Sequence, residues 1–277
     1  MSRCFAIVLT LNEEANLERC FASLRWCDEI IVIDSGSKDQ TREKAIALGA
    51  RVFVHVQPPP FKIDVQRNWA LDNALIPKDS WVLFLDTDEV VPEALARTVR
   101  EISSKPGRTF DAYELTPRYL FWGTWLKRTQ GFPNWHPRLV CIGHARFEGG
   151  VWEHFSAVTR VGRLDFPYDH FANSKGFSDW LQRHDRYSSW DAARIHEFLT
   201  DGNLARLGTT RKLRLRRLAA RFWPLRPVAR FLHMYFGRLG FLEGRSALAF
   251  CLLYAFYEYM IVVKVIELRR RSRMEPL

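Results

Sequence analysis

The first hundred residues alternate apolar runs with segments of helical periodicity. Four short runs lack the polar alternation of a half-exposed strand, which is typical of strands buried on both faces of a sheet. These predicted strands cover Cys4–Leu11, Glu29–Ile33, Arg51–Val56 and Trp81–Leu85. Apolar residues at helical spacing lie between and after them, and Gly49 marks a helix end. This order predicts an α/β fold with a mostly parallel, helix-covered sheet.

Polar side chains follow three of the predicted strands. Asn12, as a helix cap, follows the first, Asp34 ends the second and Asp86 ends the fourth. Right-handed crossovers place these residues at one sheet edge, where open α/β sheets bind ligands. An acid in the position of Asp34 commonly accepts hydrogen bonds from a nucleoside. The first loop has no GxGxxG motif, which argues against a dinucleotide cofactor.

The segment Asp86-Thr87-Asp88 follows a buried strand directly. Two carboxylates one residue apart at a strand end can reach the same small volume. Mg²⁺ and Mn²⁺ prefer such oxygen ligands, and Mg²⁺ is typically held by one or two carboxylates plus substrate phosphates. The alternative is a solvated acidic turn in which Glu89 and Glu93 favour a helix N-terminus. The strand context favours a metal site at Asp86 and Asp88.

The second half of the chain changes character. Residues 110–170 are rich in aromatic residues, glycine and proline, and they predict an irregular acceptor-side lobe with short strands such as Arg138–Ile142. Residues 177–199 have helical periodicity. We therefore divide the chain into an α/β domain that carries the candidate site, 1–175, and a helical, membrane-associating or oligomerising region, 176–277.

The C-terminal region is basic and apolar. The chain has a formal net charge of +10, and segment 206–230 combines arginines with an apolar stripe in a predicted amphipathic helix. The interleaved apolar residues favour an anionic membrane surface over nucleic acid. Ala247–Val263 is apolar except for Glu258, whose insertion near a bilayer centre costs about 2.5–3.5 kcal/mol. We therefore favour a peripheral or re-entrant helix over a span; a subunit interface of a homo-oligomer remains an alternative.

Cysteine usage and the N-terminus bear on location. The five cysteines include no CxxC pair, and the N-terminal apolar run is too short for a signal peptide. A reducing compartment fits these features. Together with the basic flanks of the apolar segment, they predict a protein at the cytoplasmic face of the inner membrane.

Several motifs together resemble family 2 glycosyltransferases. The motifs are TLNEEANL (Thr10–Leu17), VIDSGSKDQT (Val32–Thr41), QRNWAL (Gln66–Leu71) and LFLDTDEVV (Leu83–Val91). RYLFWGTWLKRTQGFPNWHPRLV (Arg118–Val140) and FEGGVWEHF (Phe147–Phe155) resemble more narrowly the lipopolysaccharide core β-1,4-glucosyltransferase branch. The resemblance implies a GT-A fold in which 1–175 is the nucleotide-sugar-binding catalytic domain. It also implies an inverting displacement, a UDP-hexose donor, and a glycolipid or oligosaccharide acceptor such as lipopolysaccharide core.

The resemblance also implies residue roles. Glu13 and Asp34 lie against the nucleoside, and Asp86 and Asp88 hold the ribose and the metal. Glu153 is the candidate general base, in a motif where Trp152 replaces the usual histidine.

Two basic residues and four histidines are further polar candidates. Arg67 and Arg138 are candidates to contact the diphosphate through a guanidinium fork, although each has a structural alternative. The histidines at 136, 144, 154 and 170 lack metal-binding spacing, so we do not predict a histidine metal site.

Two other functions fit parts of the pattern. A nucleotidyltransferase acting on a sugar phosphate would share the nucleotide site and metal, but the first loop is acidic and lacks a glycine-rich phosphate loop. A non-catalytic basic protein that binds membranes or nucleic acid would leave the acidic motifs unexplained.

Overall fold

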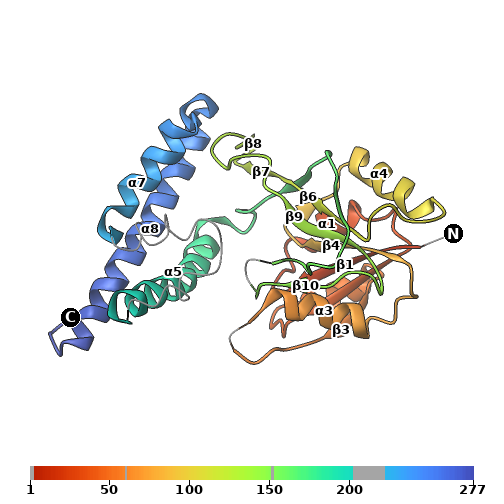
Figure 1. The fold of residues 1–277 in the computed structure, drawn as a ribbon, viewed down its shortest axis with the longest axis horizontal. Helices are drawn as coiled ribbons and strands as arrows, with labels where there is room; N and C mark the ends of the chain where they lie inside the picture. Colours follow the sequence, from red (N-terminus) through yellow and green to blue (C-terminus); the bar gives the residue numbers. More distant parts are fainter. Residues whose placement is uncertain (1–2, 60, 151–152, 202–221) are drawn as a thin grey trace. The chain divides into compact units, whose positions relative to one another are not determined.

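The computed structural model describes residues 3–59, 61–150, 153–201 and 222–277 (Figure 1). The chain divides into two compact units. The first unit contains residues 1–120 and 132–174, and the second contains 121–131 and 175–277. Each unit is described by itself.

A seven-stranded sheet forms the centre of the first unit, in the order β12-β6-β9-β4-β1-β2-β3. Strands β4, β1, β2 and β3 run parallel, whereas β9 is antiparallel to both β4 and β6. The strands are β1 (Cys4–Thr10), β2 (Glu29–Asp34), β3 (Arg51–Val54), β4 (Trp81–Asp86), β6 (Ala112–Leu115), β9 (His136–Cys141) and β12 (Val161–Arg163). The predicted mostly parallel α/β sheet is confirmed.

Helices cover both faces of this sheet (Figure 1). Leu83 and Leu85 of β4 pack into a core with α1 (Leu17–Ala22), α2 (Thr41–Ala47) and α4 (Glu93–Ser104). Val82 and Phe84 point to the opposite face, whose core includes residues of α3 (Ile63–Asn73). Because successive strand residues face opposite sides, the five consecutive apolar residues Trp81–Leu85 of β4 fill both cores.

The chain order reverses between β1 and β4. From β1 it proceeds outward through β2 to β3, then crosses back to β4 on the other side of β1. Ligands of open α/β sheets bind at such a switch point, outside the carboxyl ends of the strands. The loops after β1, β2 and β4 therefore meet at the predicted edge.

Two expectations are corrected by the structure. Asn12 does not cap a helix: it has a left-handed φ of 57°, and α1 begins only at Leu17. Segment 110–170 is less irregular than predicted, because β6, β9 and β12 extend the main sheet. Their short sequences carry little periodicity, and their pairing is set by non-local contacts.

Smaller strands complete the first unit. β13 (Tyr168–His170) pairs with β5 (Glu89–Val90) and with β7 (Pro117–Phe121), and β10 (Phe147–Glu148) pairs with β11 (His154–Phe155). β7 continues into β8 (Thr124–Trp125), which belongs to the second unit. The β5–β13 pair brings Glu89 and His170 into register beside the end of β4.

The second unit is helical. It contains α5 (Gly176–Asp201), the short helical turns η3 (Trp223–Leu225), η4 (His233–Gly237) and η5 (Gly240–Glu243), and the helices α7 (Arg226–Leu232) and α8 (Gly244–Ser272). Ala192 and Ile195 of α5 pack in one core with Ile261 and Val265 of α8. Most of the predicted amphipathic helix, 206–221, lies outside the described residues.

The apolar C-terminal segment is a long helix. Residues 240–272 are long and apolar enough to cross a membrane by length and composition, and a third of the most apolar window is buried within the protein. Glu258 is 2% exposed and accepts hydrogen bonds from Arg226 (2.6 Å) and Arg230 (2.7 and 2.9 Å). The acid is thus neutralised within the second unit, so the insertion cost calculated for an isolated charge does not apply to it.

Candidate active site

Asp34 organises the loop after β2. Its carboxylate is fully buried and accepts hydrogen bonds from the Thr10 hydroxyl (2.8 Å) and from the backbone N–H groups of Gly36 (3.0 Å) and Ser37 (2.8 Å). The Ser37 hydroxyl adds a further donor. Since both oxygens are used, Asp34 shapes the loop; a direct contact with a nucleoside stays a prediction.

The loop after β1 is fastened to the loop after β2. The backbone N–H groups of Asn12 and Glu13 donate to the hydroxyls of Ser37 (2.8 Å) and Thr41 (2.7 Å). The Asn12 side chain in turn accepts from the backbone N–H of Lys38 (2.8 Å). Glu13 is therefore held at the edge of the sheet by its main chain, which is where a nucleoside contact is predicted.

Four charged residues from separate elements meet at the end of β4. Arg138 donates to Asp86 at 3.2 Å, and a guanidinium nitrogen of Arg67 lies 4.0 Å from the other Asp86 oxygen. Arg67 also pairs with Glu153 at 2.7 Å. The structure thus brings together Glu153, Arg67, Arg138 and Asp86, all of which the sequence singled out.

Arg67 lies deep in the first unit. Only 1% of it is exposed, its guanidinium donates to the Pro137 carbonyl (2.9 Å), and the rings of Phe84 and Phe147 lie within 5.4 Å of it. A buried cation in apolar surroundings requires a counter-charge, and Glu153 provides it. Burial raises the pKa of the Glu153 carboxyl, and Arg67 opposes that shift.

Glu89 was missed as a site residue. It is fully buried, accepts the backbone N–H of Asp86 (3.0 Å) and accepts from Arg138 at 2.6 Å. Burial raises the pKa of Glu89 to about 7, although the Arg138 guanidinium opposes the shift. The alternative interpretation of an acidic turn placed Glu89 at a helix N-terminus, but Glu89 lies in β5 and orients Asp86 and Arg138. Its position directly after Asp86-Thr87-Asp88 was the available signal.

His170 was named among the histidines of the sequence but was not predicted to belong to the site. Its Nε2 lies 3.4 Å from an oxygen of Asp88, and its Nδ1 lies 3.8 Å from Glu89. Burial lowers the pKa of His170, but the nearby carboxylates, Asp88 first, outweigh burial and raise it overall. The two residues are far apart in sequence, so no spacing rule could pair them. The Asp88 carboxylate is the kind of oxygen ligand that Mg²⁺ and Mn²⁺ prefer, and the His170 nitrogen lies beside it.

Buried polar atoms without partners gather at this edge. Among the described residues, nine buried side-chain nitrogen or oxygen atoms have no hydrogen-bond partner, and five of them belong to Arg67, Arg138, Glu153 and His170. Folded proteins rarely leave such atoms unsatisfied without a functional reason. Two of the five are Arg138 nitrogens and one is Glu153 Oε2. This concentration of unused donors and one acceptor indicates a binding site for a polar, anionic ligand.

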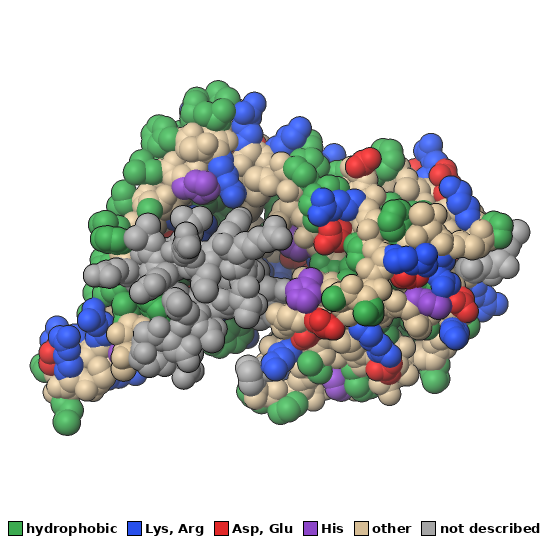
Figure 2. Space-filling view, viewed as in Figure 1, with side chains coloured by type: hydrophobic (Ala, Val, Ile, Leu, Met, Phe, Trp, Pro, Cys, Tyr) green, Lys and Arg blue, Asp and Glu red, His purple; other side chains and the backbone are tan. Residues whose placement is uncertain are grey.

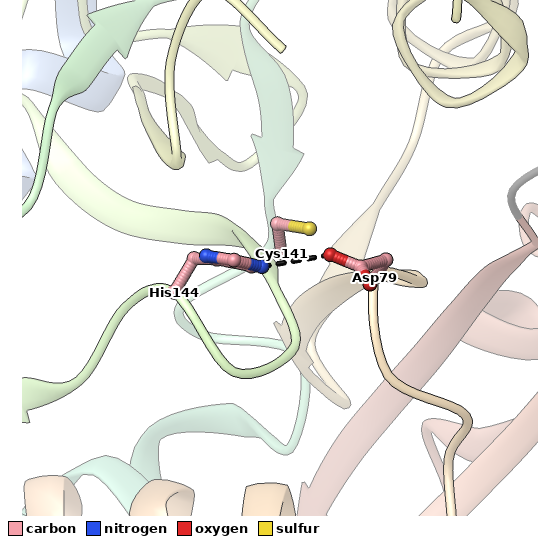
Figure 3. Close-up of side chains that lie close together, drawn as sticks. All are labelled: Asp79, Cys141 and His144. Atoms are coloured by element: carbon pink, nitrogen blue, oxygen red, sulfur yellow. Dashed lines mark hydrogen bonds and ion pairs between the residues drawn. The ribbon is translucent and has the colours of Figure 1, made fainter. Parts of the chain in front are cut away.

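A second group of potential ligands lies elsewhere in the first unit. Asp79, Cys141 and His144 have ligand atoms within 4.8 Å of one another (Figure 3). Arg108 donates to Asp79 (3.0 Å) and lies 3.1 Å from Nδ1 of His144, which must accept from a guanidinium. The remaining His144 nitrogen then carries the proton and donates to Asp79 (2.7 Å). Arg108 supplies the positive charge in this cluster, so the geometry favours an ion-paired network over a metal site.

The fold and the charged edge define a class of protein: an α/β enzyme with a nucleotide-type site at the switch point of its sheet. The sequence model of glycosyl transferase family 2 matches residues 5–152, more than half of the chain. The chain therefore belongs to glycosyl transferase family 2. This assignment confirms the resemblance and the GT-A fold, and it favours glycosyl transfer over the nucleotidyltransferase and non-catalytic alternatives.

Individual relatives are similar over shorter stretches. The lipopolysaccharide core biosynthesis glycosyltransferase LpsC of Rhizobium meliloti is 32% identical over 99 residues, which cover 35% of this chain and 36% of that protein. Glucosyl-3-phosphoglycerate synthase of Mycobacterium tuberculosis is 38% identical over 101 residues, covering 34% of this chain and 31% of that protein. The matches thus span about a third of the length of these relatives.

Solved structures overlap in part. The structure of the Mycobacterium tuberculosis glucosyl-3-phosphoglycerate synthase with Mn²⁺ and UDP-glucose is 26% identical, covers 43% of this chain and 44% of that chain, and has a TM-score of 0.32. A second mycobacterial protein is 18% identical, with a TM-score of 0.41, and covers 61% of this chain and 67% of that chain. Since both TM-scores are below 0.5, the family assignment rests on the sequence.

Proposed function

We propose that this enzyme transfers a hexose, with inversion, from a UDP-sugar to a saccharide hydroxyl of lipopolysaccharide core or a related membrane glycolipid. The observation that carries the proposal is the buried pair of Glu153 and Arg67 beside Asp86 at the end of β4. The names of two relatives support it, since one is a lipopolysaccharide core glycosyltransferase and the other a glucosyl transfer enzyme.

Glu153 acts as the general base. Its Oε1 is held by Arg67, whereas its buried Oε2 has no partner and can accept the proton of an acceptor hydroxyl. As the proton moves to Glu153, the acceptor oxygen forms a bond to the anomeric carbon of the donor sugar. The bond between that carbon and the diphosphate oxygen breaks, and UDP leaves with its electron pair. A raised pKa brings a carboxyl nearer the pH at which a base works best, and general-base catalysis contributes typically about 10²–10⁴-fold.

Asp86 and Asp88 would hold a divalent cation, and His170 lies beside Asp88. Bound there, Mn²⁺ or Mg²⁺ would neutralise the charge that develops on the leaving diphosphate. Arg138 supports the same anion: its Nε and Nη1 are buried donors without partners, while its Nη2 is anchored by Glu89 and Asp86. Glu13 and Asp34 shape or contact the nucleoside side of the site. Arg67 contributes positive charge beside Asp86.

The location follows from the acceptor. A glycolipid acceptor requires the enzyme to work at a membrane surface, and we propose a peripheral position on the cytoplasmic face of the inner membrane. The long apolar helix α8 supports this position. One side of α8 presents Leu248, Leu252, Phe256 and Tyr259 to solvent, at the three- and four-residue spacing of a single helical face. Homo-oligomer formation through this face is the competing arrangement.

Glu153→Gln tests the base. Loss of the carboxylate should lower turnover by about 10²–10⁴-fold and leave donor affinity nearly unchanged. Glu148→Gln is the matched control, because Glu148 is exposed on β10 and should tolerate the change. Asp169 is the other neighbouring carboxylate, but Arg118 already binds both of its oxygens (2.5 and 2.8 Å). If Glu153→Gln retains full turnover at saturating substrate while Glu148→Gln or Asp169→Asn loses it, the assignment of the base is wrong.

A further inference from the structure

An apolar surface covers the end of the second unit where α7 leads into α8. The exposed side chains belong to η4, η5, their connection and the turn after β7, and they are 42–68% exposed. We call this surface the cap; it consists of Trp122, Phe236, Leu239, Phe241 and Leu242. Figure 2 shows hydrophobic side chains with Lys or Arg beside them at this end of the helical unit. Soluble proteins rarely expose such a cluster without a partner for it.

Ring contacts and hydrogen bonds hold the cap residues in place. The rings of Phe236 and Phe241 lie 6.4 Å apart, and Trp122 stacks on Phe121, which packs on Phe250 of α8. The 121–131 segment is fastened to η5 by Glu243, which accepts the backbone N–H groups of Arg128 (2.5 Å) and Thr129 (2.9 Å) and the Thr129 hydroxyl (2.6 Å). The segments that carry the exposed apolar residues are therefore fixed to one another by hydrogen bonds.

The backbone at the cap is unusual. Leu239 has a left-handed φ of 58°, a conformation that leucine rarely adopts, and it is 42% exposed. Residues 233–237 form a π-helical turn, a feature that is often retained at functional sites. Strain that exposes an apolar side chain opposes folding in water, which suggests that the exposed group has a function.

The charge around the cap is positive. Segments 121–131 and 232–249 contain Lys127, Arg128, Arg238 and Arg245 and one acid, Glu243. Glu243 is occupied by three hydrogen bonds within the scaffold, as described above. Aromatic and leucine side chains bordered by basic residues match the interface of an anionic bilayer, where rings enter the headgroup region and basic groups meet lipid phosphates.

We propose that the cap is the membrane-docking surface of the enzyme and inserts its apolar side chains into an anionic lipid bilayer. The proposal rests on the proposed function, because it specifies how an enzyme with a glycolipid acceptor reaches its substrate. The positive border favours anionic lipid over a protein partner of neutral surface. Docking through the cap makes two contributions to the free energy of membrane binding: an apolar one that salt does not weaken and an electrostatic one that salt weakens.

Vesicle co-sedimentation tests the proposal. The wild-type protein should bind vesicles of phosphatidylglycerol and phosphatidylcholine more tightly than vesicles of phosphatidylcholine alone. Replacing Phe236, Phe241 and Leu242 together by serine should weaken binding to both kinds, by about tenfold per side chain removed from the bilayer. Arg245→Glu should weaken binding to the anionic vesicles by about fivefold or more and leave binding to neutral vesicles nearly unchanged.

Control variants distinguish binding through the cap from non-specific binding by other exposed apolar side chains. Leu75→Ser and Val158→Ser remove side chains of the first unit that are 79% and 90% exposed, and they should bind vesicles like the wild type. Hydrolysis of the donor by water should be the same in wild type and cap variants, since the cap contains none of the site residues. If the wild type does not turn over any UDP-sugar, the proposed function is wrong. The vesicle-binding measurements would still decide whether the cap binds a bilayer.

Two outcomes would overturn the inference. In the first, the cap variants bind anionic vesicles as tightly as the wild type. In the second, the wild type shows no preference for anionic vesicles but sediments as a dimer that the triple serine variant converts to a monomer. The second result would identify the cap as a contact between two copies of the chain.

Discussion

Replacing Arg67 by methionine should move the acid limb of the pH–rate profile upward. The general base must be ionised to accept a proton, so turnover falls as the pH drops through the pKa of Glu153. Burial already raises that pKa, and the Arg67 cation is the largest opposing influence. Arg67→Met removes the cation while keeping an unbranched side chain in the pocket between Phe84 and Phe147.

The size of the shift follows from the geometry. The paired nitrogen and oxygen are 2.7 Å apart, so the centres of the two charged groups are about 4 Å apart. At an effective dielectric constant of about 20, this separation corresponds to about 4 kcal/mol, or about three pKa units. Arg138 remains nearby and also lowers the pKa of Glu153, so we expect an upward shift of about one to three units.

The assay is turnover at saturating donor and acceptor, measured across the pH range in which the protein stays folded. Arg67→Lys is the control, because a retained positive charge should keep the acid limb within about half a unit of the wild type. Lower turnover at every pH, measured at saturating substrates, would report a loss of transition-state stabilisation and would not by itself support the base. An acid limb in Arg67→Met at the wild-type position would refute Glu153 as the base paired with Arg67.

Three further changes test the energetics of the fold. The pKa of Asp111 is lowered chiefly by hydrogen bonds from Arg160. The ionised carboxylate therefore stabilises the folded protein above the unfolded pKa of about 3.9, and this stabilisation is lost as the pH falls toward the lower folded pKa. Asp111→Asn should lower the melting temperature at pH 7, and the difference from the wild type should shrink in acid. Glu258→Gln leaves two arginines uncompensated and should reduce hydrogen-exchange protection of α8 by about 3 kcal/mol. Leu83→Ala creates a cavity in the central strand and should cost about 2–5 kcal/mol in urea unfolding.

The sequence predicted the central strands well. β1 and β4 are buried on both faces, so every position before their last residues, Thr10 and Asp86, is apolar and the pattern does not depend on distant partners. Gly49 was correctly placed after α2, because its φ of 88° requires a residue without a Cβ. The strand β9 was partly predicted as 138–142, but its antiparallel place between β4 and β6 depends on contacts across the sheet.

The sequence predicted individual residues of the site but not how they are arranged in space. Asp86, Arg67, Arg138 and Glu153 were each selected from local motifs, and the structure places them in one cluster. The contribution of His170 depends on β13 pairing with β5, a contact between residues about eighty positions apart. A pattern of local periodicity carries no information about such a pair.

Binding of UDP in the presence of Mn²⁺ tests the central claim most directly, because it requires neither the acceptor nor the identity of the sugar. Titration calorimetry on the wild type should show binding that chelation abolishes and that added Mn²⁺ restores. Asp88→Asn should lose the metal-dependent part of that affinity while keeping the wild-type circular dichroism spectrum. Failure of the wild type to bind UDP with either Mn²⁺ or Mg²⁺, or equal binding by Asp88→Asn with and without chelator, would contradict a metal-assisted nucleotide-sugar site at the end of β4.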